Sequence, residues 1–124
     1  GEKHPMTVIS SHVLDSVVGD HAAGIRIECY RVGRQTAVST QLFDVIANEQ
    51  GRITETVAID DHAPDSQYEL VFHTAAYFTA QPAMPEARQI MNEVVVRFTI
   101  PEADGKIHIP LVLSPHSYTI WWSA

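Results

Sequence analysis

The stretch HIPLVLSPHSYTIWW, residues 108–122, indicates the fold, because it joins two apolar runs through a short polar break. Proline presets a turn dihedral and serine bonds its own backbone, so Ser114–Ser117 predicts a tight reversal between two strands. In the first strand the side chains alternate between two faces. One is a plain core face, made of Ile107, Ile109, Leu111 and Leu113. The other carries His108, Pro110, Val112 and Ser114. This second face is too apolar for open solvent, so we expect a ligand or another subunit to cover it.

Length and composition predict one domain with a full hydrophobic core. A chain of 124 residues can bury roughly two thirds of its unfolded surface, so it needs no disulfide or metal cross-link to fold. The single Cys29 lies in an apolar run, which predicts a buried thiol and fits a reducing, cytoplasmic setting. The net charge of −7 argues against a nucleic-acid partner. No apolar run approaches the length of a membrane span. Residues 1–5 are expected to be a polar arm or tag remnant, and the domain to span residues 6–124.

Turn signals divide the chain into about eight short strands and one short helix. The expected strands cover residues 7–14, 25–31, 36–45, 52–59, 67–73, 93–100, 107–113 and 118–122, and residues 74–81 have helical composition. This spacing favours an all-β sandwich. No βαβ rhythm is present, so we expect no parallel sheet. In the first strand the even positions Val8, Ser10, His12 and Leu14 share a face.

Two segments resemble the signatures of the transthyretin-like family. They are Ser11-His12-Val13-Leu14-Asp15 and His108-Ile109-Pro110-Leu111-Val112-Leu113-Ser114-Pro115. The order of elements is also similar, with Gly51-Arg52 opening the fourth strand and Ala76-Tyr77-Phe78 in the short helix. The resemblance spans Met6 to the C-terminus and implies an eight-stranded, two-sheet β-sandwich with one short helix. It also implies a homotetramer, a dimer of dimers, in which a channel between the dimers covers the His108 face.

The same resemblance implies a site in that channel. The family contains 5-hydroxyisourate hydrolases, which belong to purine metabolism, and the hormone carrier transthyretin. The hydrolases place two histidines and one arginine in the channel, and the matching positions here are His12, Arg52 and His108. The carrier branch lacks this trio, so the match favours a hydrolase that opens a cyclic amide of a small heterocycle. The expected pocket wall consists of Leu14, Pro110, Thr119, Trp121 and Ser123.

The C-terminal end departs from the hydrolases, which finish in Tyr-Arg-Gly-Ser. The aligned residues here are Trp121, Trp122, Ser123 and Ala124. Because the family tail shapes and closes the pocket, we expect a different wall and allow a different substrate, for example in specialised metabolism. Alternation predicts that Trp121 faces the channel and that Trp122 faces the core side or a partner's edge. Alternatively, both bury area at a subunit contact.

The trio suits hydrolysis of a small anionic or enolic ring. A neutral histidine takes a proton from water, and the second donates to the oxyanion or the leaving nitrogen. Arg52 offers a planar fork to the oxygens of a flat ring. Burial and Arg52 would depress the pKa of both histidines. No cofactor is required, and the sequence leaves open whether His12 or His108 is the base.

Other interpretations remain. A non-catalytic small-molecule carrier is favoured by the two tryptophans and disfavoured by the trio, and a structural tetramer with a degenerate site is a weaker idea. A catalytic zinc site needs three protein ligands, with His116 as the third candidate, and we expect no metal. His21, His62 and His73 are expected to be solvated, and Ser114 to cap its turn.

Overall fold

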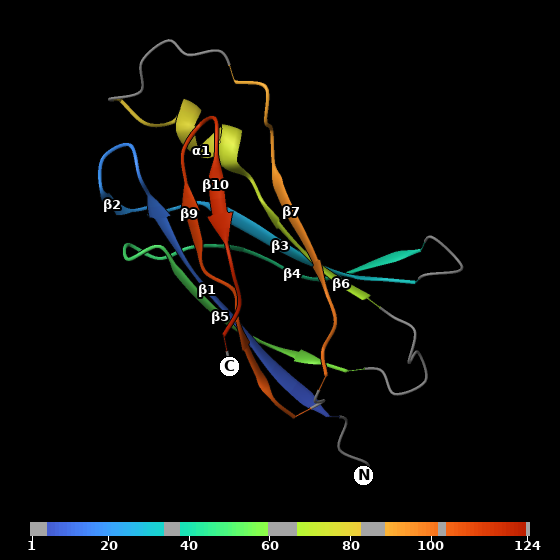
Figure 1. The fold of residues 1–124 in the computed structure, drawn as a ribbon. Coiled ribbons are helices and arrows are strands. Elements are labelled where there is room, and N and C mark those ends of the chain that lie inside the picture. The colour runs from blue at the N-terminus through green and yellow to red at the C-terminus, as the bar shows by residue number, and fades with distance from the viewer. Residues whose placement is uncertain (1–4, 34–37, 60–66, 83–88, 102–103, 124) are drawn as a thin grey trace.

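Two β-sheets pack against each other and a short helix lies at one end of the sandwich (Figure 1). The protein is described by a computed structural model that covers residues 5–33, 38–59, 67–82, 89–101 and 104–123. The elements are β1 (Met6–Asp15), β2 (Asp20–His21), β3 (Arg26–Val32), β4 (Ser39–Ile46), β5 (Arg52–Ala58), β6 (Gln67–Phe72), α1 (Thr74–Thr79), β7 (Val94–Phe98), β8 (Lys106–His108), β9 (Leu111–Leu113) and β10 (Tyr118–Ile120). The predicted all-β, two-sheet sandwich with one short helix is confirmed. Over the described ranges, no helix has the length and apolar character needed to cross a membrane.

Strand β1 is the centre of the first sheet. It pairs antiparallel with β5 on one side and parallel with β8 and β9 on the other. Strand β10 continues the sheet beyond β9, and the second sheet has the order β4-β3-β6-β7. Neither sheet is a parallel sheet, as expected, but the parallel pairs along the β1–β8–β9 seam, which make the first sheet mixed, were not predicted. The chain crosses to the second sheet and, after β7, returns to the first sheet running in the direction of β1.

The first sheet is divided more finely than predicted. The expected strand 107–113 is interrupted at Pro110, which has no N–H to give to a ladder, and so becomes β8 and β9. The backbone N–H of Ile109 still donates to the Ser10 carbonyl (2.9 Å), which keeps both pieces aligned with β1. Strand β2 was not predicted, because two residues cannot show a period. Residues 1–4, 34–37, His62 and Ala124 lie outside the described part of the chain.

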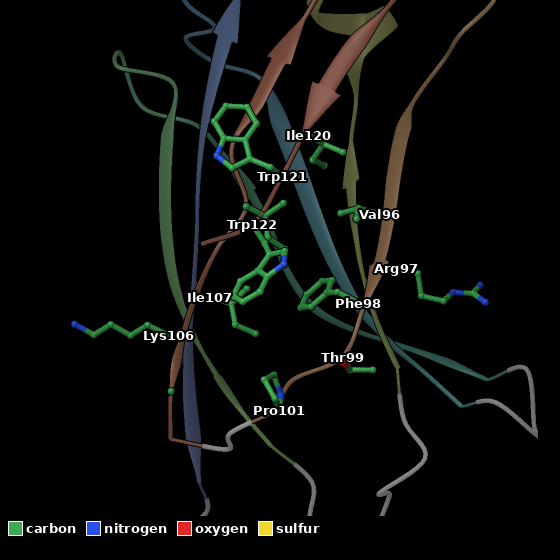
Figure 2. Close-up of a pocket in the computed structure, with 12 residues that line it drawn as sticks. Val96, Arg97, Phe98, Thr99, Pro101, Lys106, Ile107, Ile120, Trp121 and Trp122 are labelled. Atoms are coloured by element: carbon green, nitrogen blue, oxygen red, sulfur yellow. The ribbon is translucent and has the colours of Figure 1, made fainter. Parts of the chain in front are cut away.

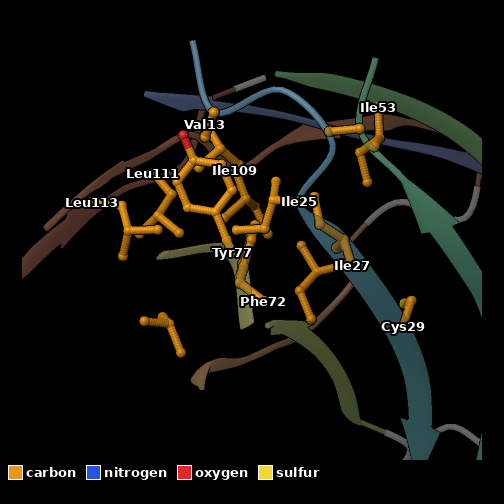
Figure 3. Packing of buried hydrophobic residues seen from close by; sticks show 14 of the residues in the cluster. Val13, Ile25, Ile27, Cys29, Ile53, Phe72, Tyr77, Ile109, Leu111 and Leu113 are labelled. Carbon is orange, nitrogen blue, oxygen red and sulfur yellow. The ribbon is translucent and has the colours of Figure 1, made fainter. Parts of the chain in front are cut away.

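The core lies between the two sheets and is built from alternate residues of each strand (Figure 3). In β1 every second residue is buried, and Ile107, Ile109, Leu111 and Leu113 are also buried, which confirms the predicted core face. Cys29 is fully buried as expected, and burial raises the pKa of its thiol to about 12, so it is a packing residue. The turn between β9 and β10 is closed by Ser114, whose Oγ accepts from the Ser117 N–H (3.0 Å), as predicted.

A buried carboxylate ties helix α1 to the first sheet. Asp15 is 2% exposed, and its Oδ2 accepts a hydrogen bond from the Tyr77 hydroxyl (2.8 Å). Its Oδ1 accepts from the N–H of Val17 (2.9 Å), in the turn that leads to β2. Burial, with the hydrogen bond to Asp15, raises the pKa of the Tyr77 hydroxyl, which therefore remains a donor. One side chain thus fixes the helix, the end of β1 and the start of β2.

A second polar network lies on β3, away from the first sheet. Glu28 accepts hydrogen bonds from the Tyr30 hydroxyl and from Gln41 Nε2 (2.8 Å), and its Oε1 lies 2.5 Å from His73 Nε2. The hydrogen bond from Tyr30, followed by that from His73, lowers the pKa of the Glu28 carboxyl. The expectation that His73 is solvated is wrong, since its side chain is 18% exposed and is held by this carboxylate.

Replacing Tyr77 with phenylalanine tests the tie between α1 and β1. A hydrogen bond to a charged group contributes about 1.5–3 kcal/mol, so Tyr77→Phe should lower the free energy of unfolding by that amount. The exposed Tyr118 supplies the control, because Tyr118→Phe should change stability by less than about 0.5 kcal/mol. Urea unfolding monitored by tryptophan fluorescence measures both. Equal stabilities of the two variants would show that the Asp15 bond does not hold the helix.

Candidate functional site

The outward face of the first sheet brings the predicted trio together. His12 on β1 is the direct antiparallel partner of Arg52 on β5. Ser10 lies two residues before His12 on the same face, and it is the partner of His108 on β8. Directly opposed side chains have Cβ atoms about 4.5–5.5 Å apart, and diagonal neighbours are within reach of long side chains. Arg52 therefore lies beside His12 and His108 lies diagonally across from it.

The electrostatics of His12 reflect this arrangement. Its pKa is lowered from the ordinary histidine value of 6.5, first by burial and then by the positive charges of Arg52, His21 and His108. A hydrogen bond to the backbone carbonyl of Gln50 opposes the shift. The predicted depression of the His12 pKa is confirmed in direction. A lowered pKa leaves the imidazole neutral and able to accept a proton near pH 7.

His108 is held through both its ring and its backbone. Its Nδ1 lies 2.8 Å from Ser10 Oγ, which fixes the orientation of the imidazole and leaves Nε2 as the second ring nitrogen. Its backbone N–H donates to the Ser123 carbonyl (2.9 Å), and the Ser123 N–H donates back (2.8 Å). Sequence analysis placed Ser10 on the His12 face through alternation but gave it no role.

His21 is the residue that sequence reasoning missed. It was expected in a solvated loop, but it lies on β2, where it pairs with Leu14 of β1. Its side chain is exposed, yet its Nδ1 lies 3.0 Å from His12 Nε2 and the two ring centroids are 5.2 Å apart. The face therefore carries three imidazoles and one guanidinium. No spacing rule could have found this neighbour, because the pairing depends on a two-residue strand.

A tight turn before β5 fixes the positions of Arg52 and of the Gln50 backbone. Asn48 Oδ1 accepts hydrogen bonds from the N–H groups of Gln50 (2.9 Å) and Arg52 (3.0 Å). Gly51 has φ of +69°, and a Cβ at this position would lie 2.4 Å from the Val13 carbonyl oxygen. The turn packs so closely against β1 that only glycine fits between the two backbones.

The five expected wall residues differ in exposure. Leu14 is half-buried and Pro110 is buried, so its ring offers little surface to a ligand. The outer residues Thr119, Trp121 and Ser123 are exposed. Val112 lies between the half-buried Leu14 and the exposed Thr119, because it pairs with Leu14 on β1 and with Thr119 on β10. In one copy of the chain, this face is therefore open to solvent on the β10 side.

The two tryptophans diverge at the edge of the sandwich. Figure 2 shows the Trp122 indole beside Phe98 and Ile107, and the Trp121 indole turned away from them. Both belong to the lining of a cavity of about 680 Å³ between β7 and the last strands. Trp122 therefore turns toward the core side of the last strand, one of the two directions predicted for it, although it is 72% exposed at the mouth of this cavity.

Metal ligation finds no support on the described part of the chain. No group of three or more histidine, cysteine, aspartate or glutamate side chains within those ranges is arranged to hold a metal ion. His116, the third zinc candidate, is exposed in the turn between β9 and β10. The groups that this face presents are imidazoles, a guanidinium, a hydroxyl and apolar side chains.

The fold and this face define a transthyretin-like β-sandwich protein with a cationic site on one sheet. The sequence profile of the HIUase/Transthyretin family matches residues 9–122. The 5-hydroxyisourate hydrolase of Pseudomonas aeruginosa is 34% identical over 122 residues, covering 98% of this chain and 94% of the relative. The enzyme of the same name from Deinococcus radiodurans is 33% identical over 113 residues, and this alignment covers 91% of this chain and 92% of the relative. The chain belongs to the HIUase/transthyretin family, and these relatives make it a 5-hydroxyisourate-hydrolase-like member.

Solved structures agree on the fold. Transthyretin from Sparus aurata superposes with a TM-score of 0.73 at 26% identity, covering 98% of this chain and 97% of that one. The 5-hydroxyisourate hydrolase of Klebsiella pneumoniae gives a TM-score of 0.70 at 23% identity, with 95% and 99% covered. Both the carrier and the hydrolase share this sandwich, so the fold alone does not separate the two activities.

The Gly51 turn can be tested with a matched pair of glycines. Gly19 has nearly the same φ, +71°, but a Cβ there would meet nothing within 4 Å. Both Gly19→Ala and Gly51→Ala carry the cost of a left-handed backbone, about 1–3 kcal/mol. Gly51→Ala should lose at least about 1 kcal/mol more, because its Cβ overpacks the Val13 carbonyl. Thermal and urea unfolding measure the difference, and equal losses would contradict the close approach of the two backbones.

Proposed function

We propose that this protein is a cofactor-free hydrolase that opens a cyclic amide of 5-hydroxyisourate, or of a closely related heterocycle, with histidine-activated water. The observation that carries the proposal is the meeting of His12, Arg52 and His108 on one sheet face of a chain whose relatives are named 5-hydroxyisourate hydrolases. A cytoplasmic location goes with it, since the only cysteine is a buried free thiol, as a reducing compartment maintains.

In this mechanism the three side chains divide the work. Arg52 binds the oxygens of a flat, anionic ring through its planar fork. A neutral imidazole takes a proton from water as the water oxygen bonds to the amide carbon. A second imidazole donates to the developing oxyanion or to the leaving nitrogen as the C–N bond breaks. The lowered pKa of His12 favours the base role, and the Ser10 hydroxyl orients His108.

Substrate choice is assigned to the C-terminal residues and the outer wall. Trp121 is 46% exposed, and an indole face stacks on a conjugated ring. Thr119 and Ser123 add exposed hydroxyls, and half-buried Leu14 adds apolar surface on the inner side, where Pro110 lies buried beneath. With these residues in place of a Tyr-Arg-Gly-Ser tail, we propose a pocket that also takes conjugated heterocycles other than 5-hydroxyisourate.

We further propose that the protein assembles as a homotetramer, a dimer of dimers, with the small-molecule substrate bound between copies. Support comes from the open side of the face, where Thr119, Trp121 and Ser123 are exposed in a single chain. A second copy laid over this side would exclude water from the trio, and exclusion of water strengthens the electrostatic interactions there. Analytical ultracentrifugation of the intact protein decides the assembly.

A second candidate function is a non-catalytic small-molecule carrier. It is favoured by the two exposed tryptophans, Trp121 and Trp122, which line a cavity with apolar residues of β7 and the last strands. It does not account for the depressed pKa of His12 or for the clustering of Arg52 with imidazoles. A carrier would return 5-hydroxyisourate chemically unchanged apart from its spontaneous decay, whereas the hydrolase consumes it.

Absorbance decay of freshly generated 5-hydroxyisourate provides the direct test. His12→Ala, Arg52→Ala and His108→Ala should each lower kcat/KM by about 100-fold or more, since positioned acid–base groups contribute 10²–10⁴-fold. Arg52→Lys should raise KM, because the charge stays but the two-pronged contact is lost. His116→Ala is the matched histidine control and should behave as wild type. Decay no faster than in buffer would exclude this substrate for the wild-type protein.

The pH dependence of the reaction follows from the depressed pKa of His12. The base form is present above this pKa, so kcat/KM should fall as the pH drops through it, with a midpoint below 6.5. Arg52→Ala should raise that midpoint, because the guanidinium helps to hold the pKa of His12 down. A midpoint at or above 6.5 in the wild type, unchanged in Arg52→Ala, would contradict the assignment of His12.

A further inference from the structure

We propose that Lys106 adds an anion-binding subsite to this face, so that the preferred substrate is a flat heterocycle that carries an anionic substituent, such as a carboxylate. This inference rests on the proposed hydrolase function and deepens it, because it names the class of ring that the site selects. Strand register, exposure and the pairing of charges on the two sheets support it.

Lys106 lies on the same outer face as the proposed catalytic residues. In β8 the side chain of Ile107 is buried, whereas those of Lys106 and His108 on either side of it point outward. Lys106 is the parallel partner of Val8 on β1, and His108 is the partner of Ser10, two positions further along. Figure 2 shows the Lys106 side chain extending away from Ile107.

The outward residues of β8, β1 and β5 form three rows across the sheet. The first row holds Lys106, Val8 and Thr56, the second holds His108, Ser10 and Thr54, and the third holds His12 and Arg52. Successive rows are about 6.6 Å apart, and neighbouring strands are about 4.8 Å apart. The lysine ammonium, on its flexible four-carbon stem, can therefore reach a substituent of a ring held over the second and third rows.

The pairing of charges distinguishes this face from the second sheet. Arg26 and Arg97, on the second sheet, each form an ion pair with a carboxylate of a neighbouring strand (2.7 and 2.6 Å). The ion pairs within the described ranges include neither Arg52 nor Lys106. In a protein with a formal net charge of −7, two cations on one face without a carboxylate partner favour an anionic ligand there.

The described acidic side chains near this end of the sheet are engaged elsewhere. Asp104 lies two residues before Lys106, and its Oδ1 accepts the backbone N–H of Met6 (3.2 Å). Glu55 lies on the core side of β5, where it is half-buried. In the proposed tetramer a second copy would shield the cations of this face from water, and an anionic group on the ligand would offset the cost of burying them.

A ring with an anionic substituent fits both ends of the face. Its ring oxygens bind Arg52, its amide lies beside His12 and His108, and its substituent accepts a hydrogen bond from Lys106. Hydrogen bonds between an ammonium and a carboxylate belong to the stronger class. Lys106 transfers no proton in this arrangement, so it contributes to the affinity for the ligand rather than to the rate of the chemical step.

Two xanthines that differ in one substituent test the subsite directly. The probes are 9-methylxanthine and 9-(carboxymethyl)xanthine, which share a flat ring, and only the second carries a carboxylate. Titration calorimetry of the wild-type protein should show about tenfold tighter binding of the carboxymethyl compound. Lys106→Met keeps an unbranched side chain without the charge and should abolish this preference, and Lys106→Glu should reverse it. The preference should also shrink as salt is added.

Arg97→Met is the matched control, because it removes one positive charge from the second sheet. It should retain the tenfold preference, which would show that the preference does not come from the net charge of the protein. Equal binding of the two probes by the wild-type protein, failure of both probes to bind, or a preference that survives in Lys106→Met would overturn the subsite.

The subsite and the hydrolase function can fail separately. If the wild-type protein consumes 5-hydroxyisourate but does not distinguish the two xanthines, the subsite at Lys106 is wrong and the hydrolase function stands. If the protein leaves 5-hydroxyisourate to its spontaneous decay and still shows a preference that depends on Lys106, the reaction is wrong and the subsite stands.

Discussion

The register of β1 is the constraint on which the site depends. Its ten residues alternate between core and outer face over their whole length, so a slip by one position would bury His12 and expose Ile9. Such a slip is opposed on both sides, by antiparallel pairing with β5 and parallel pairing with β8 and β9. The buried Ser11 side chain also stabilises this register, because its Oγ donates a hydrogen bond to the Ile109 carbonyl (2.6 Å) between β8 and β9. Three side chains from distant parts of the chain meet because one strand has no freedom to shift.

The charge distribution makes this face unlike the rest of the molecule. The chain carries a formal net charge of −7, yet Arg52 and three imidazoles gather on one sheet surface. A local cationic patch on an anionic protein favours a small anion over larger acidic partners, which the remaining surface repels. Burial and the neighbouring Arg52 lower the pKa of His12, which favours the neutral form of this imidazole beside the guanidinium. In the proposed mechanism the same shift supplies the base, so that binding and catalysis would depend on one electrostatic arrangement.

Alternation and turn chemistry predicted most of the fold, because a half-buried strand shows its period over five or more residues. His12 and His108 came from the two signatures, and Arg52 came from the Gly51-Arg52 pair that opens the fourth strand. Three features escaped the sequence for physical reasons. The parallel seam depends on a crossover between sheets, which leaves no local pattern. Strand β2 and His21 depend on a two-residue pairing, and His73 is held by Glu28, a partner 45 positions away. None of the three leaves a periodic signal in the sequence.

The C-terminal residues proposed to set substrate specificity are different from the residues proposed to carry out the chemistry, although both groups lie on the first sheet. Ser123 forms an isolated bridge with His108, with hydrogen bonds in both directions, so the end of the chain is pinned beside the catalytic face. Trp121 is linked to the same strand region, since its N–H donates to the Pro110 carbonyl (3.4 Å). The proposed acid–base residues, His12 and His108, lie on β1 and β8, and neither belongs to this tail. A change of side chain at Trp121 can therefore reshape the pocket wall while the backbone that holds His108 stays in place.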